Sequence, residues 1–395
     1  MSSTYTAVTP QGQVIVWRDR KRWAWLLSVV WPLVPLLGLW AHHATGHEIA
    51  LGLPLLISYG LMPLLDAWFG EDQNNPPEAV VGQLDADRYY RWLTWATVPL
   101  HFVALIACAW WAGTQGLSWW AVALLAYVIG ADSGLGLNTA HELGHKHNRL
   151  EQMLARLSLA VPAYGHFTVE HGRGHHRWVA TPEDHASSRM GESIYRFALR
   201  ELPGGIRRAW ALESNRLRQA GQGVWSWHNT MLQSYALTLL LQGALVSAFG
   251  WVMLPFLAIH NLVAWWQLTS ANYVEHYGLM RRKGPDGRYE APQPQHSWNA
   301  NHLVTNLATF HLQRHSDHHA NPSRRYQCLR HFADLPQLPS GYFGMFAVAY
   351  WPRWWFRVMD PRLMALPQVQ GDLGRVNLCP RARAALQARW GVRAD

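Results

Sequence analysis

The chain has 395 residues, of which 49% are hydrophobic and only 15% charged, and it contains 24 tryptophans and 22 histidines. Indole rings favour the two interfaces of a bilayer, so this tryptophan content is typical of a membrane protein. The formal charge of +9 fits anionic lipid or an acidic protein partner. No motif of a nucleic-acid-binding module is present, so nucleic acid is not an expected partner.

The chain contains three cysteines, Cys108, Cys328 and Cys379, which lie far apart in the sequence. No CxxC pair exists, so the sequence does not support a rubredoxin-like iron site, a zinc ribbon or a disulfide framework. We interpret each cysteine as an ordinary apolar residue.

Six apolar segments are long enough to cross about 30 Å of hydrocarbon. The first 17 residues lack the apolar core of a cleavable signal peptide, and the basic cluster at 18–22 precedes a first span that we expect to be retained. The second span contains Gly52, Pro54, Gly60 and Pro63 and is expected to be kinked. Short connections join the spans into three helical hairpins. The predicted spans are 23–41, 48–65, 92–112, 118–139, 230–249 and 251–271.

Lysine and arginine are absent from 23–87, 92–145 and 219–280, so every basic residue falls in segments that six spans place on one face. The positive-inside rule makes that face cytoplasmic, together with both termini. We therefore expect an all-α integral membrane protein with a helical cytoplasmic cap. Its parts are an N-terminal segment 1–22, spans one to four in 23–139, an insert 140–229, spans five and six in 230–271, and a C-terminal region 272–395.

The two polar inserts have a mostly helical pattern. We expect helix breaks at Pro182 and at Pro203-Gly204-Gly205, and a turn at Gly284-Pro285-Asp286-Gly287. There is no internal repeat and no low-complexity tract.

Nine histidines fall into four boxes that lie in the inserts or where spans four and six leave the membrane. Spacings of three and four place imidazoles on one helical face, and an adjacent pair diverges by about 100°, so it can serve two metals. Nine imidazoles exceed what one metal uses but give two metals four or five ligands each. Imidazole suits Zn, Cu, Fe or Ni, so the residues alone leave the metal open. The predicted ligands are His141, His145, His171, His175, His176, His276, His315, His318 and His319.

Carboxylates near the boxes are candidates for orienting ligand imidazoles by hydrogen bonding. The alternative is a surface salt bridge; for Glu275 and Asp317, which stand between or beside ligand positions, we favour the orienting role. For Asp184 helix capping is an equal alternative. The candidates are Glu142, Glu170, Asp184, Glu275 and Asp317.

These boxes resemble those of the integral-membrane alkane hydroxylases (alkane 1-monooxygenases), within the membrane fatty-acid desaturase–hydroxylase superfamily. The resemblance rests on the strings at 141–146, 170–176, 272–279 and 312–320, of which Asn-Tyr-Val-Glu-His-Tyr-Gly-Leu is the most discriminating. It covers roughly 18–365. One departure is His185, where the family usually has proline.

The resemblance implies six membrane helices, a di-iron centre held by nine histidines, and O₂-dependent hydroxylation of medium-chain n-alkanes to 1-alkanols. It implies location in a bacterial inner membrane. It also implies electrons from rubredoxin, reduced by rubredoxin reductase; without CxxC pairs, the rubredoxin must be a separate protein.

An alkane dissolves in the bilayer, so we expect it to enter laterally through an apolar slot that ends at the histidines. Ser58 and Tyr59 are candidates for lining that slot, although a helix-packing role fits them equally well. Two rival functions remain: a related membrane di-iron lipid desaturase or hydroxylase, and, more distantly, a metal transporter. A transporter would place its polar ligands inside the spans.

Overall fold

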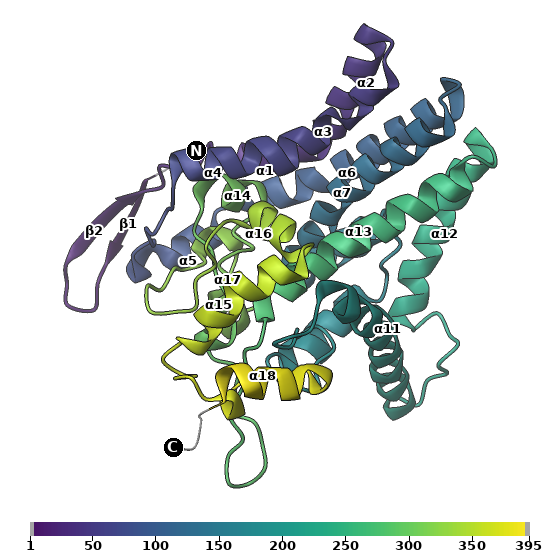
Figure 1. The fold of residues 1–395 in the computed structure, drawn as a ribbon. Helices are drawn as coiled ribbons and strands as arrows, with labels where there is room; N and C mark the ends of the chain where they lie inside the picture. Colours follow the sequence, from purple (N-terminus) through teal and green to yellow (C-terminus); the bar gives the residue numbers. More distant parts are fainter. Residues whose placement is uncertain (1–3, 392–395) are drawn as a thin grey trace.

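The computed structural model describes residues 4–391, and this part of the chain is mostly helical. Its membrane-type helices lie side by side and reach away from a mixed region of short helices and loops (Figure 1). Five helical segments are long and apolar enough to cross a membrane: Leu26–Thr45, Glu48–Phe69, Arg88–Thr114, Trp119–Gly144 and Thr230–Phe249.

The first two of these segments are built from several elements. The first combines α1 (Leu26–Val30), a 3-10 turn at Trp31–Leu33 and α2 (Val34–Thr45). The second combines a 3-10 turn at Glu48–Gly52, α3 (Leu53–Leu56), a π-helical turn at Ile57–Leu61 and α4 (Met62–Phe69). Prolines interrupt the backbone hydrogen bonding of both segments, which agrees with the irregularity expected for span two.

The remaining spans are continuous helices: α6 (Arg88–Thr114), α7 (Trp119–Gly144) and α12 (Thr230–Phe249). The predicted sixth span lies in α13 (Met253–His276), which follows α12 as a hairpin partner. Its C-terminal half carries buried polar side chains such as Gln267 and Asn272, and α13 is not among the five segments that meet the membrane criterion.

Helices α7 and α13 approach each other closely at two glycines of α7. A Cβ atom at Gly130 would lie 2.6 Å from the His260 carbonyl oxygen, and one at Gly134 would lie 2.4 Å from Cβ of Gln267. Small residues spaced by four are the usual means by which membrane helices reach close contact.

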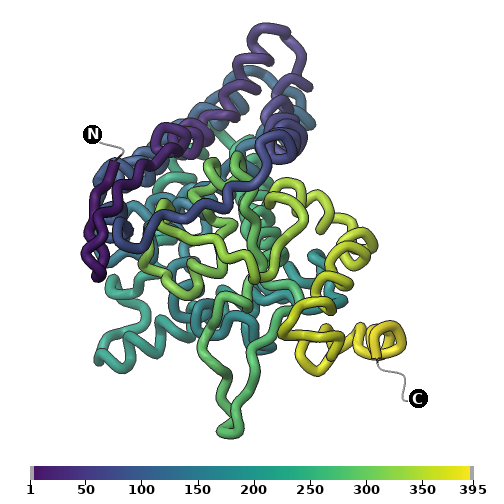
Figure 2. Tube along the Cα trace, turned by 90° about the vertical axis from the view of Figure 1, so that its left-hand side faces the viewer, coloured from purple at the N-terminus to yellow at the C-terminus, as the bar shows by residue number. Residues whose placement is uncertain are grey.

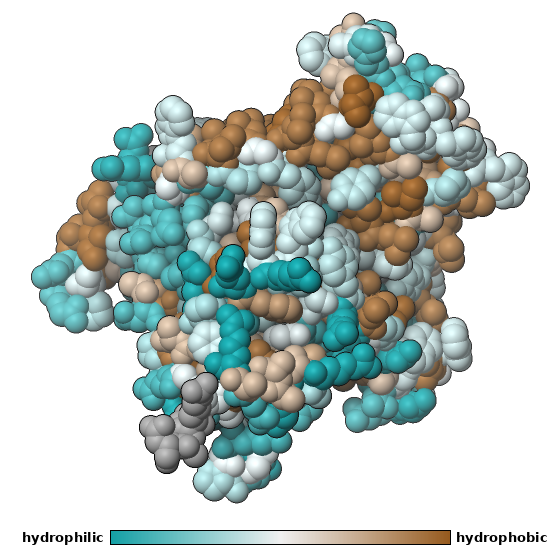
Figure 3. All heavy atoms as spheres, in the orientation of Figure 1, coloured by the Kyte–Doolittle hydropathy of each residue, from teal (hydrophilic) through white to brown (hydrophobic). Residues whose placement is uncertain are grey.

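Hydrophobic residues gather on the surface of these spans, in the upper part of the view, and hydrophilic residues predominate toward the opposite end of the molecule (Figure 3). Exposed tryptophans mark both ends of the spans: Trp40, Trp119 and Trp251 flank the short hairpin connections, whereas Trp68, Trp225 and Trp227 lie at the other ends. Because α12 has 20 residues and rises 1.5 Å per residue, the two groups are separated by about 30 Å, the thickness of a hydrocarbon core. The chain is therefore a membrane protein.

The non-membrane part packs around a large core contributed by the inserts and the C-terminal region. Its helices are α5 (Glu78–Ala86), α8 (Arg149–Ala160), α9 (Phe167–Val169), α10 (His176–Trp178), α11 (Ile194–Gln219), α14 (Leu303–Ala308), α15 (His315–Ala320), α16 (Tyr342–Ala349), α17 (Pro352–Met364) and α18 (Arg383–Trp390). The expected turn at 284–287 is present, with Gly287 at φ 73°, and it projects as a loop on the side opposite the spans (Figure 2).

Two local expectations are corrected. The N-terminal segment contains an antiparallel hairpin of β1 (Thr4–Val8) and β2 (Val14–Arg18), turning at Gly12 with φ 80°. Helix α11 runs unbroken through Pro203-Gly204-Gly205. Pro203 has no backbone N–H to donate to the carbonyl of Leu199, one turn earlier in the helix. Leu199 is 80% exposed, so water can satisfy that carbonyl.

Candidate metal centre

The nine box histidines come together in two groups. His141, His145, His171, His176 and His318 form one group, and His175, His276, His315 and His319 form the other. Within each group, the ligand-capable nitrogen atoms all lie within 4.8 Å of one another. The structure thus assembles every predicted ligand, with five in one group and four in the other.

Four separate chain segments deliver these side chains. His141 lies on α7 and His145 immediately after it, and His276 is the last residue of α13. The second box, residues 170–176, supplies His171, His175 and His176, and α15 supplies His315, His318 and His319. Box two includes a π-helical turn at Glu170–His175. This wider turn brings His171 and His176, five residues apart, to 3.0 Å between their Nε2 atoms, and π-turns of this kind often occur at functional sites.

The ring nitrogens fit a metal ion. Within the groups, Nε2 atoms face one another at 2.8 Å for His141 and His318, 2.9 Å for His315 and His319, and 3.2 Å for His276 and His315. A metal–nitrogen bond of about 2.1 Å places two ligands at a right angle about 3.0 Å apart. The Nε2 atoms of His145 and His175 are buried without a hydrogen-bond partner. Such convergence of acceptor atoms is explained by a shared cation.

Burial keeps the rings in the form that binds metal. Desolvation lowers the pKa of His171, His176, His318 and His319 well below the ordinary value, and neighbouring histidines lower it further. Neutral imidazole is the ligand form, so little proton release is needed when a metal binds at neutral pH.

Asp184 contacts one of the clustered histidines. Its Oδ2 lies 2.9 Å from Nδ1 of His175, which leaves Nε2 of that ring directed into the four-histidine group. Burial alone would raise the pKa of Asp184, but His175 and Arg208 hold it well below its usual range. The carboxylate contacts a ligand ring and caps no helix, so of the two alternatives for Asp184 the contacts support orientation.

The other carboxylates have different partners. Glu275 accepts a hydrogen bond of 2.9 Å from the Tyr342 hydroxyl, and its Oε2 lies 3.3 Å from Nε2 of His315. Glu142, Glu170 and Asp317 instead form ion pairs with Lys146, Arg208 and Arg324, respectively. For Asp317, the contacts therefore support the salt-bridge alternative. Sequence reasoning missed Arg208 and Tyr342, since no spacing pattern connects them to the boxes.

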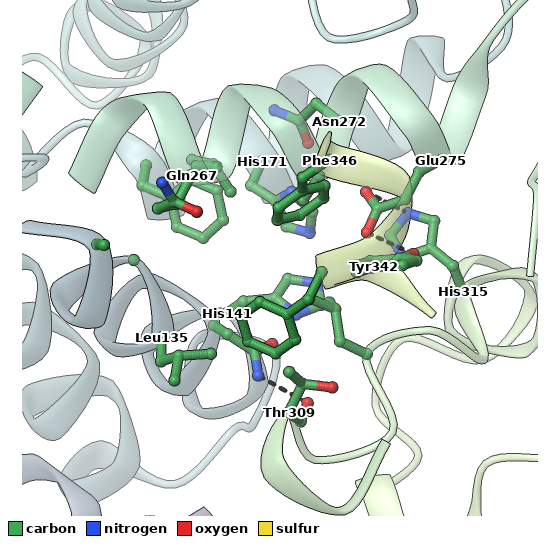
Figure 4. Close-up of a pocket in the computed structure, with 18 residues that line it drawn as sticks. Leu135, His141, His171, Gln267, Asn272, Glu275, Thr309, His315, Tyr342 and Phe346 are labelled. Atoms are coloured by element: carbon green, nitrogen blue, oxygen red, sulfur yellow. Dashed lines mark hydrogen bonds and ion pairs between the residues drawn. The ribbon is translucent and has the colours of Figure 1, made fainter. Parts of the chain in front are cut away.

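An apolar cavity leads from the spans to the histidines (Figure 4). His141 and His171 from the first group and His315 from the second line one end, and Ala131, Gly134 and Leu135 of α7 line its length. Its other walls are formed by Asn138, Phe167, Gln267, Leu268, Ala271, Asn272, Glu275, Thr309, Leu312, Tyr342, Phe343 and Phe346. Both histidine groups are thus accessible from one apolar slot.

The two predicted channel residues, Ser58 and Tyr59, are not among the described residues that line this cavity. The Tyr59 hydroxyl donates a 2.6 Å hydrogen bond to Gln267, and its ring packs edge-on against Phe343 at 5.9 Å. Tyr59 therefore supports two lining side chains from outside.

Membrane-spanning helices joined to two groups of clustered histidines are typical of a membrane-bound metalloenzyme. The comparison with known families agrees with this class. The fatty acid desaturase profile matches residues 117–357. The chain is 53% identical over 374 residues to alkane 1-monooxygenase of Ectopseudomonas oleovorans, covering 95% of this chain and 93% of that protein. It is also 53% identical over 375 residues to alkane 1-monooxygenase 1 of Alcanivorax borkumensis, covering 95% and 92%.

A more distant relative is the hydroxylase component of xylene/toluene monooxygenase of Pseudomonas putida, 29% identical over 271 residues, or 67% of this chain and 69% of that protein. The chain belongs to the alkane 1-monooxygenase family of membrane-bound, metal-dependent oxygenases, within the wider fatty acid desaturase class. The family resemblance read from the boxes is thereby confirmed.

Proposed function

We propose that this enzyme hydroxylates the terminal methyl group of medium-chain n-alkanes to give 1-alkanols, using O₂ and two bound irons. The observation that carries the proposal is the apolar cavity that ends at His141 and His315, one from each histidine group. Relatives at 53% identity bear the name alkane 1-monooxygenase.

The cofactor is a pair of non-haem irons, one in each histidine group. When bound, the irons supply the O₂ activation that a strong, apolar C–H bond requires, because acid–base chemistry has no group there to act on. The protein's part is to hold nine neutral imidazoles in place, to position the chain end beside them and to exclude water. Asp184 keeps His175 oriented for this purpose.

The length of the slot suits a medium-length chain. Ala131 and His141 are ten residues apart on α7 and both line it, so the slot extends about 15 Å. With carbon–carbon bonds of about 1.5 Å, an extended alkyl chain advances about 1.3 Å per carbon, so about 12 carbons fit. The cavity volume of about 60 Å³ is smaller than such a chain, so the lining side chains must move apart as the alkane enters, and a narrow slot of this kind favours end-on entry and therefore attack at the terminal carbon.

The arrangement in the membrane follows from α13 and from the charges. With α13 as the sixth span, the three hairpins leave all lysines and arginines on one face, which we assign to the cytoplasmic side of a bacterial inner membrane. The segments 4–22 and 277–391 and the histidine groups then lie on that side, as the predicted cytoplasmic cap requires. The buried polar half of α13 faces the cavity and the metal centre, which explains its lower hydropathy.

Rubredoxin is the proposed electron donor, as a separate protein reduced by its own reductase. A basic hollow of about 680 Å³ supports this, since it is lined by Arg281, Arg282, Lys283 and Arg375. The loop that follows Lys283 projects on the side away from the spans (Figure 2). His296 lines the same hollow, and its carbonyl oxygen lies 3.4 Å from Nδ1 of His276. An acidic donor docked there would be close to the four-histidine group.

The test combines metal analysis with product analysis. Purified enzyme in lipid should contain two irons per chain and should convert octane or dodecane to the 1-alkanol only when O₂, rubredoxin and its reductase are present. An alkene product would instead establish a desaturase, and preferential oxidation of toluene would favour the chemistry of the xylene/toluene relative. Zinc in place of iron, with no product, would favour a metal transporter.

A further inference from the structure

A second, smaller cavity lies next to the substrate slot. Its volume is about 20 Å³, enough for one water molecule. Phe167, His171, Leu268 and Asn272 line both cavities, so this small cavity is separated from the slot by a wall one side chain thick. Its remaining walls come from Tyr164, Glu170, His175, His185, Ala186, Glu201 and Gly205.

Glu201 is the unusual side chain in this cavity. It lies on the buried face of α11, is only 5% exposed, and forms no ion pair with any described residue. Its two carboxylate oxygens accept hydrogen bonds of 2.7 Å from the Thr269 hydroxyl and 3.0 Å from the Asn272 amide, both on α13. Burial raises its pKa to about 7 in spite of these two hydrogen bonds, which oppose the rise. Glu201 therefore holds a proton in part of the molecules at neutral pH.

The glycine pair of α11 creates the space beside Glu201. A Cβ at Gly204 would lie 2.4 Å from Nδ1 of His185, so only glycine lets that imidazole rest on the helix. A Cβ at Gly205 would lie 3.7 Å from Glu170, an ordinary contact that would project into the cavity. The half-buried His185 forms the side of the cavity nearest to solvent.

The proposed reaction consumes protons close to this cavity. One oxygen atom of O₂ enters the C–H bond, and the other leaves as water after taking two electrons from the donor and two protons. The slot is largely apolar, and the one carboxyl group among its described lining residues, Glu275, is held by the Tyr342 hydroxyl and by His315. Asn272, in contrast, lines both cavities, and its amide donates a hydrogen bond to the Glu201 carboxylate. The Tyr164 hydroxyl, at the same cavity, makes no hydrogen bond within the described part of the chain, so it is free to bond a water there.

From this arrangement we infer that Glu201 passes protons, one at a time, through the small cavity to the oxygen that becomes water, and that His185 reloads it from solvent. This role rests on the proposed function. In each transfer the carboxyl O–H bond breaks, the oxygen of a water in the small cavity takes up that proton and gives up one of its own toward the slot, and the carboxylate then regains a proton from His185 on the outer side. The ionisable groups around Glu201 are Arg200 on its own helix and Tyr164, Glu170, His171, His175 and His185 on facing elements.

The decisive variant is Glu201→Gln, compared with wild type in lipid with both irons bound. Gln keeps the shape and the hydrogen bonds, because the Asn272 amide can turn to accept from it. We expect kcat to fall about 100-fold, the typical contribution of a positioned acid, with unchanged KM for octane and for the electron donor. In wild type, kcat should fall as the pH rises through about 7, because the protonated donor is lost; in the variant this dependence should be absent.

Two further variants separate the relay from a structural role. Glu201→Asp should recover part of kcat, and Gly205→Ala should slow the enzyme by filling the cavity without removing the carboxyl group. Glu78→Gln, at an exposed carboxylate on α5, is the matched control and should change nothing. Loss of iron in Glu201→Gln, or an unchanged kcat and pH profile, would overturn the inference.

A spectroscopic measurement does not depend on turnover. Infrared difference spectra of the wild-type protein should show a protonated carboxyl band that shifts in D₂O and titrates near pH 7, and Glu201→Gln should lack it. If wild-type protein yields no alkanol but shows this band, the proposed function fails while the titration of Glu201 stands. If alkanol forms and the band is absent, the relay fails by itself.

Discussion

His175 and His176 are adjacent in the chain, yet their imidazoles belong to different metal-binding groups, with ring centroids 5.9 Å apart and ring planes at 78°. His318 and His319 repeat this relationship at 5.7 Å and 75°. Each of these two short segments therefore holds both groups at once. Movement of either segment would disturb both groups together, so a substitution within either adjacent pair is expected to affect both metals.

His276 tests the division into two groups. It contributes to the four-histidine group only, so His276→Ala should reduce iron from two per chain to about one, with loss of hydroxylation. Iron and protein are quantified on the same preparation. His228→Ala, at an exposed histidine outside both groups, is the control. Two irons retained in His276→Ala would remove this residue from the site.

Asp184→Asn should weaken metal retention. Losing the charge that fixes the His175 ring is expected to lower iron affinity or activity about 10- to 100-fold, the usual effect of removing such a partner. Iron release to a chelator, followed over time, measures it. Glu183→Gln, one residue earlier and exposed, should release iron at the wild-type rate; equal rates in both variants would contradict the orienting role.

Ala131→Phe should shorten the preferred alkane. Position 131 lines the slot about 15 Å from His141 along α7, so a phenyl ring there occupies the space of the last carbons of a long chain. We expect the ratio of octane to dodecane hydroxylation to rise about tenfold or more, since each excluded methylene is worth roughly 1–3 kcal/mol. Leu262→Phe, exposed on α13, should leave the ratio unchanged.

The double substitution of Arg282 and Lys283 by Ala should raise KM for rubredoxin several-fold and reduce its dependence on salt, because both side chains are exposed at the basic hollow. The KM for octane should not change. Arg218→Ala, exposed at the end of α11, provides a control that removes a positive charge away from the hollow. A donor KM equal to that of wild type would place the docking surface elsewhere.

The spans could be predicted because hydropathy and charge act on the whole segment. The interval 230–249 agrees with α12 within its limits, whereas spans three and four extend further in α6 and α7 than hydropathy indicated. Helix α7 extends to Gly144 because its last turns carry His141 into the cluster of histidines. There the helix is surrounded by α15 and by residues 170–176, and not by lipid. Tertiary packing, which no local pattern records, likewise keeps α11 helical through Pro203.

The ligands of the site could be predicted, but their division could not. Histidine spacing indicates two metals, while the π-helical turn that groups His171 with His176 is visible only in three dimensions. The sequence signal for Glu201 is its position within the pattern of α11: it is a carboxylate surrounded on the buried face by Phe197, Ala198, Gly204 and Gly205. A charged residue on an apolar helix face requires a partner or a role.

The contact of Gly130 and Gly134 with α13 restricts how relatives of this enzyme can diversify. Any larger residue at either glycine would push two helices apart, and α7 also carries His141, so the shift would reach the metal centre. Adaptation to longer or bulkier hydrocarbons is therefore expected through exchanges at lining positions such as Ala131 and Leu135, with helix spacing held constant. Directed evolution libraries should vary those positions and leave the glycines fixed.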